Sequence, residues 1–278
     1  MRHEHDFSAV AAERVSARGE LVVVAKADRT RIERLYQEGA AKLRMPTREA
    51  DPLEAVLINT AGGLTGGDRL DWAVTVGEGA SAVVTTQACE KLYRASSGTA
   101  EVGCRLSVAA GGRLAWLPQE TIVFDNSAIC RRIDLDLAPG AEALIMEATV
   151  FGRRAMGEQV RHARFSDRWR VWRRGSLIHA EDFAVGPEID GQLASRAALG
   201  GAEAFATVLL FSEDAAANID AARAIIGEAG GASAWEVAGS GKLLARLVAG
   251  DGYTLRRRLI PLLELLNERA GLPKVWTL

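Results

Sequence analysis

The sequence predicts a mainly β protein, either a layered β-sandwich or a solenoid-like stack of strands, with a few helices towards the C-terminus. Three observations support this: short apolar runs that alternate with polar residues, a weak internal repeat of tight turns, and helical periodicity confined to the last third of the chain. With 278 residues, 48% of them apolar, the chain can bury a substantial core. We expect a flexible N-terminus, residues 1–17, followed by one domain over residues 18–278.

The first predicted elements are strands. Residues 1–17 are polar and show no sustained period, which is why we expect them to be flexible. Residues 20–26 (Glu-Leu-Val-Val-Val-Ala-Lys) are typical of a buried strand, and residues 31–36 indicate a second strand or a connector.

A weak repeat in the middle of the chain predicts how the strands are arranged. Residues 76–84, 108–116 and 137–145 share an order of apolar residue, short turn, glycine and apolar residue, with Gly79, Gly111 and Gly140 at equivalent positions. Each copy is predicted to form a strand, a tight turn and a returning strand, so stacked copies would build layered sheets.

The strand pattern continues through residues 169–178. Trp169, Val171 and Arg173 would face one side of this strand, and Arg170 and Trp172 the other. Interleaved tryptophan and arginine can stack on nucleic acid bases, but in a nearly neutral chain cation–π packing on a sheet face is favoured.

Two helices are predicted near the C-terminus, over residues 213–226 and 259–270. Ser212 is a suitable N-cap for the first and Gly227 follows it, whereas Gly271 and Pro273 mark the end of the second. The leucines of the second helix form an apolar stripe that would pack on the sheet or accept a partner helix.

Composition excludes several classes of function. The 34 basic and 36 acidic residues nearly balance, so neither nucleic acid nor an anionic membrane is an expected partner. The sequence has no apolar run of membrane-spanning length and no apolar core of a signal peptide, so we expect a cytoplasmic protein. The spacing of Cys89, Cys104 and Cys130 predicts neither a disulfide framework nor a metal knuckle.

The most distinctive local feature is a loop at residues 58–70, Ile-Asn-Thr-Ala-Gly-Gly-Leu-Thr-Gly-Gly-Asp-Arg-Leu. Paired glycines allow backbone conformations that other residues resist, which indicates a shaped loop. It lacks the Gly-Lys-Ser/Thr ending of a phosphate-binding loop, and the residues that follow alternate like a strand. The run Gly-Ser-Gly-Lys at residues 239–242 lacks the hydroxyl residue that should come next, so we interpret it as a turn between strands.

No catalytic constellation is evident. The four histidines are too scattered for a zinc site, and there is no Gly-x-Ser-x-Gly motif around a nucleophile. Several carboxylates lie at the ends of apolar strands, and paired acids could serve a glycosidase, but nothing fixes any two of them at the required separation.

Four segments in register carry a resemblance to a known family. They are residues 62–68, 85–94 (Thr-Thr-Gln-Ala-Cys-Glu-Lys-Leu-Tyr-Arg), 116–124 (Trp-Leu-Pro-Gln-Glu-Thr-Ile-Val-Phe) and 151–158 (Phe-Gly-Arg-Arg-Ala-Met-Gly-Glu). In order and spacing they resemble the urease accessory protein D family (UreD, called UreH in some organisms). The chain departs from the pattern at Cys89 and Glu90, where smaller or more neutral residues are expected.

The resemblance implies a non-catalytic maturation chaperone. Such a protein would bind apo-urease and the accessory protein UreF, with the GTPase UreG joining the complex, and nickel would pass through a polar route in its interior. No tightly bound cofactor is expected, only transient Ni²⁺. Carboxylates hold Ni²⁺ less tightly than cysteine or histidine, which suits a conduit that must release its ion.

Two sets of candidate residues follow from the resemblance. The candidate nickel route comprises acids that lie in or beside the matching motifs or a repeat strand: Asp68, Glu90, Glu120, Glu147 and Glu158. The candidate partner interface, or the mouth of the route, is the glycine loop: Gly62, Gly63, Gly66, Gly67 and Arg69.

Two alternatives remain at this stage. One is a β-sandwich hydrolase that acts through paired carboxylates, and the other is a generic protein-binding module. A hydrolase would be active when purified alone, whereas a conduit would show no activity of its own.

Overall fold

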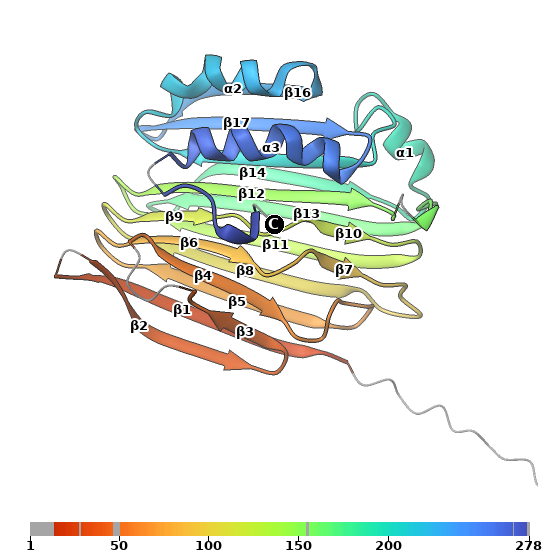
Figure 1. Cartoon of the computed structure of the whole chain (residues 1–278), viewed down its shortest axis with the longest axis horizontal. Helices are drawn as coiled ribbons and strands as arrows, with labels where there is room; N and C mark the ends of the chain where they lie inside the picture. The colour runs from red at the N-terminus through yellow and green to blue at the C-terminus, as the bar shows by residue number, and fades with distance from the viewer. Residues whose placement is uncertain (1–13, 28, 47–50, 154–155, 269, 277–278) are drawn as a thin grey trace, which may run out of the picture.

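The computed structural model describes residues 14–27, 29–46, 51–153, 156–268 and 270–276, and it forms two large β-sheets packed face to face (Figure 1). The expected flexible segment falls mostly on residues 1–13, which lie outside the described residues, and the first strand begins at Ser16, before the expected boundary.

The first sheet has seven strands. In spatial order they are β14 (Ser176–Val185), β13 (Ala163–Arg173), β11 (Ser127–Leu137), β8 (Ala100–Val108), β5 (Arg69–Val76), β1 (Ser16–Lys26) and β2 (Arg29–Glu38).

The second sheet has ten strands. Eight form its main path: β16 (Gly230–Val237), β17 (Ser240–Ala249), β15 (Ala204–Phe211), β12 (Glu142–Phe151), β9 (Arg113–Trp116), β6 (Ser81–Thr86), β4 (Leu53–Asn59) and β3 (Ala41–Arg44). Beside β12 lie the short strands β10 (Thr121–Val123) and β7 (Glu90–Leu92).

The central strands form a two-sheet coil, which confirms the solenoid-like arrangement. The chain leaves the seven-stranded sheet through tight turns at Gly79, Gly111 and Gly140, all with positive φ, and returns in the ten-stranded sheet as β6, β9 and β12. Equivalent strands of successive turns then pair in parallel, β5 with β8 and β8 with β11. The returning strand of each repeat unit therefore belongs to the opposite sheet, so the unit is one corner of the coil.

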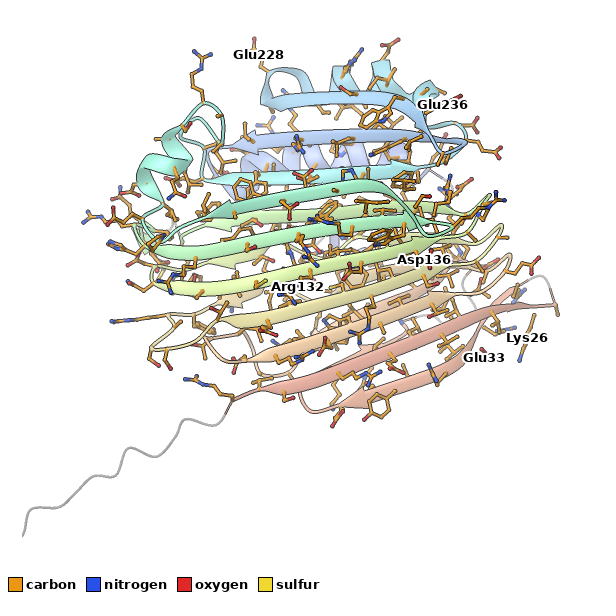
Figure 2. All side chains as sticks on the ribbon, turned by 180° about the vertical axis from the view of Figure 1, so that it is seen from behind. Lys26, Glu33, Arg132, Asp136, Glu228 and Glu236 are labelled. Carbon is orange, nitrogen blue, oxygen red and sulfur yellow. The ribbon has the colours of Figure 1, made fainter. Side chains whose placement is uncertain are left out.

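Alternation along the strands builds the core. On β13, Trp169 and Val171 are buried between the sheets whereas Trp172 is exposed on the outer face, as the sequence predicts. The outer face of the seven-stranded sheet is polar, with Arg132 and Asp136 of β11 upon it (Figure 2).

A second core lies between the ten-stranded sheet and the C-terminal helices (Figure 1). The leucine stripe of α3 (Gly252–Leu266) is buried there, which confirms packing on the sheet. The α-helix α2 (Ile219–Ile226) also packs against this face, after a 3₁₀ turn, η2 (Ala215–Asn218). Smaller elements are α1 (Asp190–Ala194), η3 (Gly227–Ala229) and η4 (Lys274–Trp276).

The predicted helix boundaries need correction. The segment expected as one helix over 213–226 is α-helical only from Ile219, and the helix expected over 259–270 runs from Gly252 to Leu266. It starts early because the Asp251 side chain caps it, accepting a hydrogen bond from Thr254 N at 2.6 Å. The predicted turn between strands is confirmed between β16 and β17, but it lies at residues 238–239, and residues 240–242 already belong to β17. Within the described ranges, no helix combines the length and apolar character needed to span a membrane.

Candidate functional site

A buried ion cluster lies between the two sheets, and we call Arg131, Glu147 and Asp167 the Arg131 cluster. Arg131 donates from Nε and Nη2 to the two oxygens of Asp167, at 3.1 and 2.6 Å, and from Nη1 to Glu147. Its Nη1 also donates to Thr121 Oγ1 at 3.0 Å. The residues come from β11, β12, β13 and β10, so both sheets contribute to one polar site.

Two buried indoles complete the cluster. Trp116 Nε1 donates to Glu147 at 3.0 Å, and Trp169 Nε1 donates to Asp167 at 3.1 Å. One guanidinium therefore faces two carboxylates in an otherwise apolar interior. Burial raises the pKa of Glu147, although the charge of Arg131 opposes the shift. The ion pair with Arg131 offsets part of the cost of burying this carboxylate.

A second buried carboxylate, Glu120, is held by the C-terminal helix. Arg256 of α3 donates from Nε and Nη2 to the two oxygens of Glu120, both at 2.6 Å, and also donates to Gln119. The Cys89 thiol donates to Glu120 at 3.4 Å, and burial raises the pKa of this thiol to about 11. Cys89 is thus a neutral neighbour of the carboxylate.

A third acid, Glu90, lines a cavity of about 150 Å³ together with Asn59, Gly62 and Cys89. Asn59 Nδ2 donates to both carboxylate oxygens, at 3.1 and 3.2 Å. Burial raises the pKa of Glu90 to about 7, with the Asn59 hydrogen bond acting in the opposite direction. The folded chain therefore holds a proton on Glu90 up to a higher pH than the unfolded chain does.

Short strands connect these three acids. Strand β10 pairs in parallel with β7 on one side and β12 on the other, so Thr121 lies opposite both Glu90 and Thr149. Glu90 N donates to the carbonyl of Glu120 at 3.0 Å. Of the five predicted route residues, Glu90 lies beside Thr121 in the strand register, and Arg131 joins Thr121 to Glu147 between the sheets. The side chain of Glu120 points instead to Arg256 of α3, on the face of the ten-stranded sheet that the helices cover.

The remaining two predicted acids stabilise loops. The buried Asp68 side chain accepts hydrogen bonds from Val15 N at 2.9 Å and Thr65 N at 2.7 Å. Glu158 forms an ion pair with Arg153 at 2.7 Å, and it accepts a hydrogen bond from Asp125 N at 3.4 Å. These contacts fix the backbone of their loops.

The glycine loop is closely packed at two positions. A Cβ on Gly63 would lie 2.4 Å from the Tyr93 ring, and one on Gly66 would lie 2.3 Å from the Ser97 carbonyl oxygen. A Cβ on Gly62 meets nothing within 4 Å, although its φ of +79° favours glycine. Gly67 packs on Arg14, and the exposed Arg69 pairs with Asp71 at 2.7 Å.

Within the described part of the chain, no group of three or more histidine, cysteine, aspartate or glutamate side chains could hold a metal ion. The acids around Thr121 are instead paired with arginines or an amide. Oxygen ligands in ones and twos would bind a transition metal ion weakly.

Sequence reasoning missed Arg131, Asp167 and Arg256. Arg131 lies at a buried position between Ile129 and Ile133, so a signal existed: a charged residue on the apolar side of an alternating strand. No comparable local signal marks Arg256, because its partner Glu120 is 136 positions away.

The chain is similar to known proteins over nearly its whole length. Residues 15–277 match the family described as UreD urease accessory protein. The urease accessory protein UreD of Mesorhizobium japonicum is 61% identical over 273 residues, 98% of each chain. Urease accessory protein UreD 1 of Brucella melitensis is 57% identical over 276 residues, 99% of each chain, and that of Brucella anthropi is 56% identical over 279 residues, again 99% of each. The chain therefore belongs to the UreD family of urease accessory proteins.

Proposed function

We propose that the chain is a urease maturation chaperone that binds apo-urease and passes Ni²⁺ through its interior to the urease active site. Membership of a family of urease accessory proteins supports the maturation role. Because the family is one of accessory proteins, we do not retain the hydrolase alternative. The match over nearly the whole chain also makes the hypothesis of a generic binding module unnecessary.

The observation that supports the nickel route is the order of the acids around β10: Glu90 lies beside Thr121, Glu120 precedes it in the chain, and Arg131 joins Thr121 to Glu147. The Glu90 cavity would admit the ion, and Glu120 and Glu147 would follow. Burial raises the pKa of Glu90 to about 7, so this carboxyl can lose a proton as a cation arrives and regain it as the cation leaves.

The arginines have a place in this route. Arg256 and Arg131 neutralise Glu120 and Glu147 when no ion is present, which lowers the cost of keeping these carboxylates buried. A passing dication would have to compete with each guanidinium, so its residence at each step would be short. Transient binding of this kind suits delivery better than storage.

We further propose that the chain works in the cytoplasm in a complex with the accessory protein UreF, to which the GTPase UreG is recruited. The glycine loop around Gly62 is the candidate interface or route mouth, since Gly62 and Glu90 line the same cavity.

The test is co-expression of apo-urease and the accessory proteins with the wild-type chain, with Glu90→Gln or Glu147→Gln, or without the chain. Nickel per active site and recovery of the complex are measured together. We expect both variants to assemble but to load less nickel, while Glu33→Gln, an exposed change on β2, serves as a control that loads normally. Full loading without the chain would refute the maturation role, and full loading by a Glu90→Gln/Glu147→Gln double variant would refute the route.

A further inference from the structure

The end of the sandwich that carries the glycine turns contains an arginine with no hydrogen-bonded partner among the described residues. Arg173 is the last residue of β13, points between the sheets and is only 5% exposed. Its Nε and Nη2 are buried, and neither donates a hydrogen bond to any described residue. The guanidinium lies 6.0 Å from the centroid of the Phe211 ring. An unsatisfied buried donor is costly, so this arrangement needs an explanation.

The other buried arginine contacts of the protein indicate what these two atoms are suited to bind. In Arg131 the same pair, Nε and Nη2, holds the two oxygens of Asp167, and in Arg256 it holds the two oxygens of Glu120. The two N–H groups on this edge of a guanidinium form a planar fork that matches a carboxylate. Arg173 therefore has the edge that elsewhere in this chain grips a carboxylate.

A second buried cation strengthens the positive potential. Lys242 is 4% exposed, donates to the Ile178 carbonyl at 3.2 Å, and lies 5.6 Å from the centroid of the same Phe211 ring. Among the described residues, neither Arg173 nor Lys242 has a carboxylate within ion-pair distance. Burial lowers the pKa of both side chains, and Arg174 lowers that of Arg173 further. An anion beside Arg173 would relieve this unfavourable charge.

Arg173 lines a pocket of about 450 Å³, which we call the Arg173 pocket. Its wall includes the three repeat turns at Gly79, Gly111 and Gly140, together with Gly239 of the β16–β17 turn. The pocket lies at the end of the sandwich where Lys26, Asp136 and Glu236 are seen in Figure 2. The turns of the internal repeat and the Gly-Ser-Gly-Lys run at residues 239–242 therefore both contribute to this pocket.

Acidic residues at the pocket limit the kind of anion that can enter. Asp51, Glu142 and Glu213 also line it, of which Asp51 and Glu213 are exposed and Glu142 pairs with Arg113 at 3.6 Å. Exposed acids are screened by solvent but still disfavour a multiply charged anion. A carboxylate is planar, so it matches the guanidinium fork, and it carries a single charge, so the nearby acids repel it less than they repel phosphate.

We propose that the Arg173 pocket is a carboxylate-binding site in which the Arg173 side chain turns its Nε and Nη2 edge, which is covered by protein in the ligand-free chain, towards the two oxygens of the ligand. The ligand is a small organic acid or the Asp or Glu side chain of a partner protein. This inference goes beyond nickel delivery, and its first test does not depend on the proposed function.

The first test measures thermal unfolding of the full chain during titration with sodium acetate, at constant ionic strength maintained with chloride. Acetamide, which has the same shape without the charge, is the control ligand. We expect a saturable rise in Tm with acetate only, since a ligand that binds the folded state stabilises it by mass action. Arg173→Met should abolish the response and raise Tm without acetate, because it removes an unpaired buried charge. Arg168→Gln, an exposed change on the same strand, should respond like the wild type.

The second test distinguishes the sources of the carboxylate. The affinity of the wild-type chain, Arg173→Lys and Arg168→Gln for apo-urease with its accessory proteins is measured with and without acetate. A loss of tenfold or more confined to Arg173→Lys, together with competition by acetate, assigns the carboxylate to a partner. An acetate response of the isolated chain with unchanged partner affinity assigns it to a small acid. If acetate affects wild type and Arg173→Met equally and partner affinity is unchanged, the proposal is overturned.

Discussion

Arg256 holds both carboxylate oxygens of Glu120 at 2.6 Å, although 136 positions separate the two residues in the sequence. The pair joins the C-terminal helix α3 to the segment that leads into β10. It therefore couples the packing of the helices on the ten-stranded sheet to the candidate nickel route.

Replacement of Arg256 should destabilise the protein. Arg256→Gln leaves the buried Glu120 without its cation, and since Arg256 is partly exposed we expect a loss of about 2 kcal/mol in the free energy of unfolding. Urea unfolding measures this directly. The neighbouring, exposed Arg257→Gln should change little, and a loss of equal size in both variants would assign the effect to the charge of α3 and not to the ion pair.

Glu90 should make stability depend on pH. Its pKa is about 7 in the folded chain and near its ordinary value of 4.5 in the unfolded chain, so the folded state retains a proton that the unfolded state has lost between these values. Its contribution to stability should therefore fall as pH rises from about 4.5 to 7, and stay constant above. We expect Glu90→Gln to flatten this slope and to stabilise the protein by about 1 to 3 kcal/mol at pH 8. Unfolding of wild type, Glu90→Gln and Glu101→Gln at pH 5.5, 6.5 and 8 tests this, and parallel curves for all three would contradict it.

The glycine loop should respond differently at two positions. Gly66→Ala places a Cβ against the Ser97 and Gly98 carbonyl oxygens, at 2.3 and 2.7 Å, and should cost more than about 2 kcal/mol because the backbone must move. Gly62→Ala meets no atom within 4 Å and should cost only about 1 kcal/mol for its positive φ. Thermal unfolding compares the two. If Gly62→Ala stays folded but binds the partner proteins more weakly, the loss of binding would show that Gly62 lies in the interface.

The C-terminal tryptophan should contribute strongly to stability. Trp276 is buried, donates from Nε1 to the Leu117 carbonyl at 3.1 Å, and lies under Arg256 at 5.2 Å. Trp276→Ala removes these contacts and leaves a cavity, so we expect a loss of about 3 to 5 kcal/mol. The control is Tyr253→Ala on α3, where the side chain is 75% exposed and the change should be small. Comparable losses in urea unfolding would contradict this view of the C-terminus.

Local signals in the sequence predicted the coil, whereas pairings between strands or residues far apart in the sequence could not be predicted from them. Gly79, Gly111 and Gly140 mark the corners because a positive φ is a requirement of the local backbone, visible from residue type. The assignment of each returning strand to the opposite sheet depends on parallel pairing between repeats, which no single segment encodes. The early start of α3 at Asp251 was missed because charged residues follow it before the leucine stripe becomes continuous.

The candidate site was predictable to a similar extent. Glu90, Glu120 and Glu147 were found as acids beside strand motifs, and their proximity follows from the pairing of β10 with both neighbours. The same criterion selected Asp68 and Glu158, whose side chains instead fix loops, because sequence cannot separate a carboxylate that accepts backbone hydrogen bonds from one that faces the interior. The unsatisfied guanidinium of Arg173 depends on three-dimensional surroundings, and residue type alone does not reveal it.

The path of the C-terminus has a consequence for biosynthesis. A ribosome releases the chain from its N-terminal end, so β10 and Glu120 emerge long before Arg256 and Trp276. Until α3 leaves the ribosome, the outer face of the ten-stranded sheet lacks this helix, and Glu120 lacks its guanidinium. A nascent chain at that point therefore exposes an apolar face and an uncompensated acid, and both are covered only when α3 packs on the sheet.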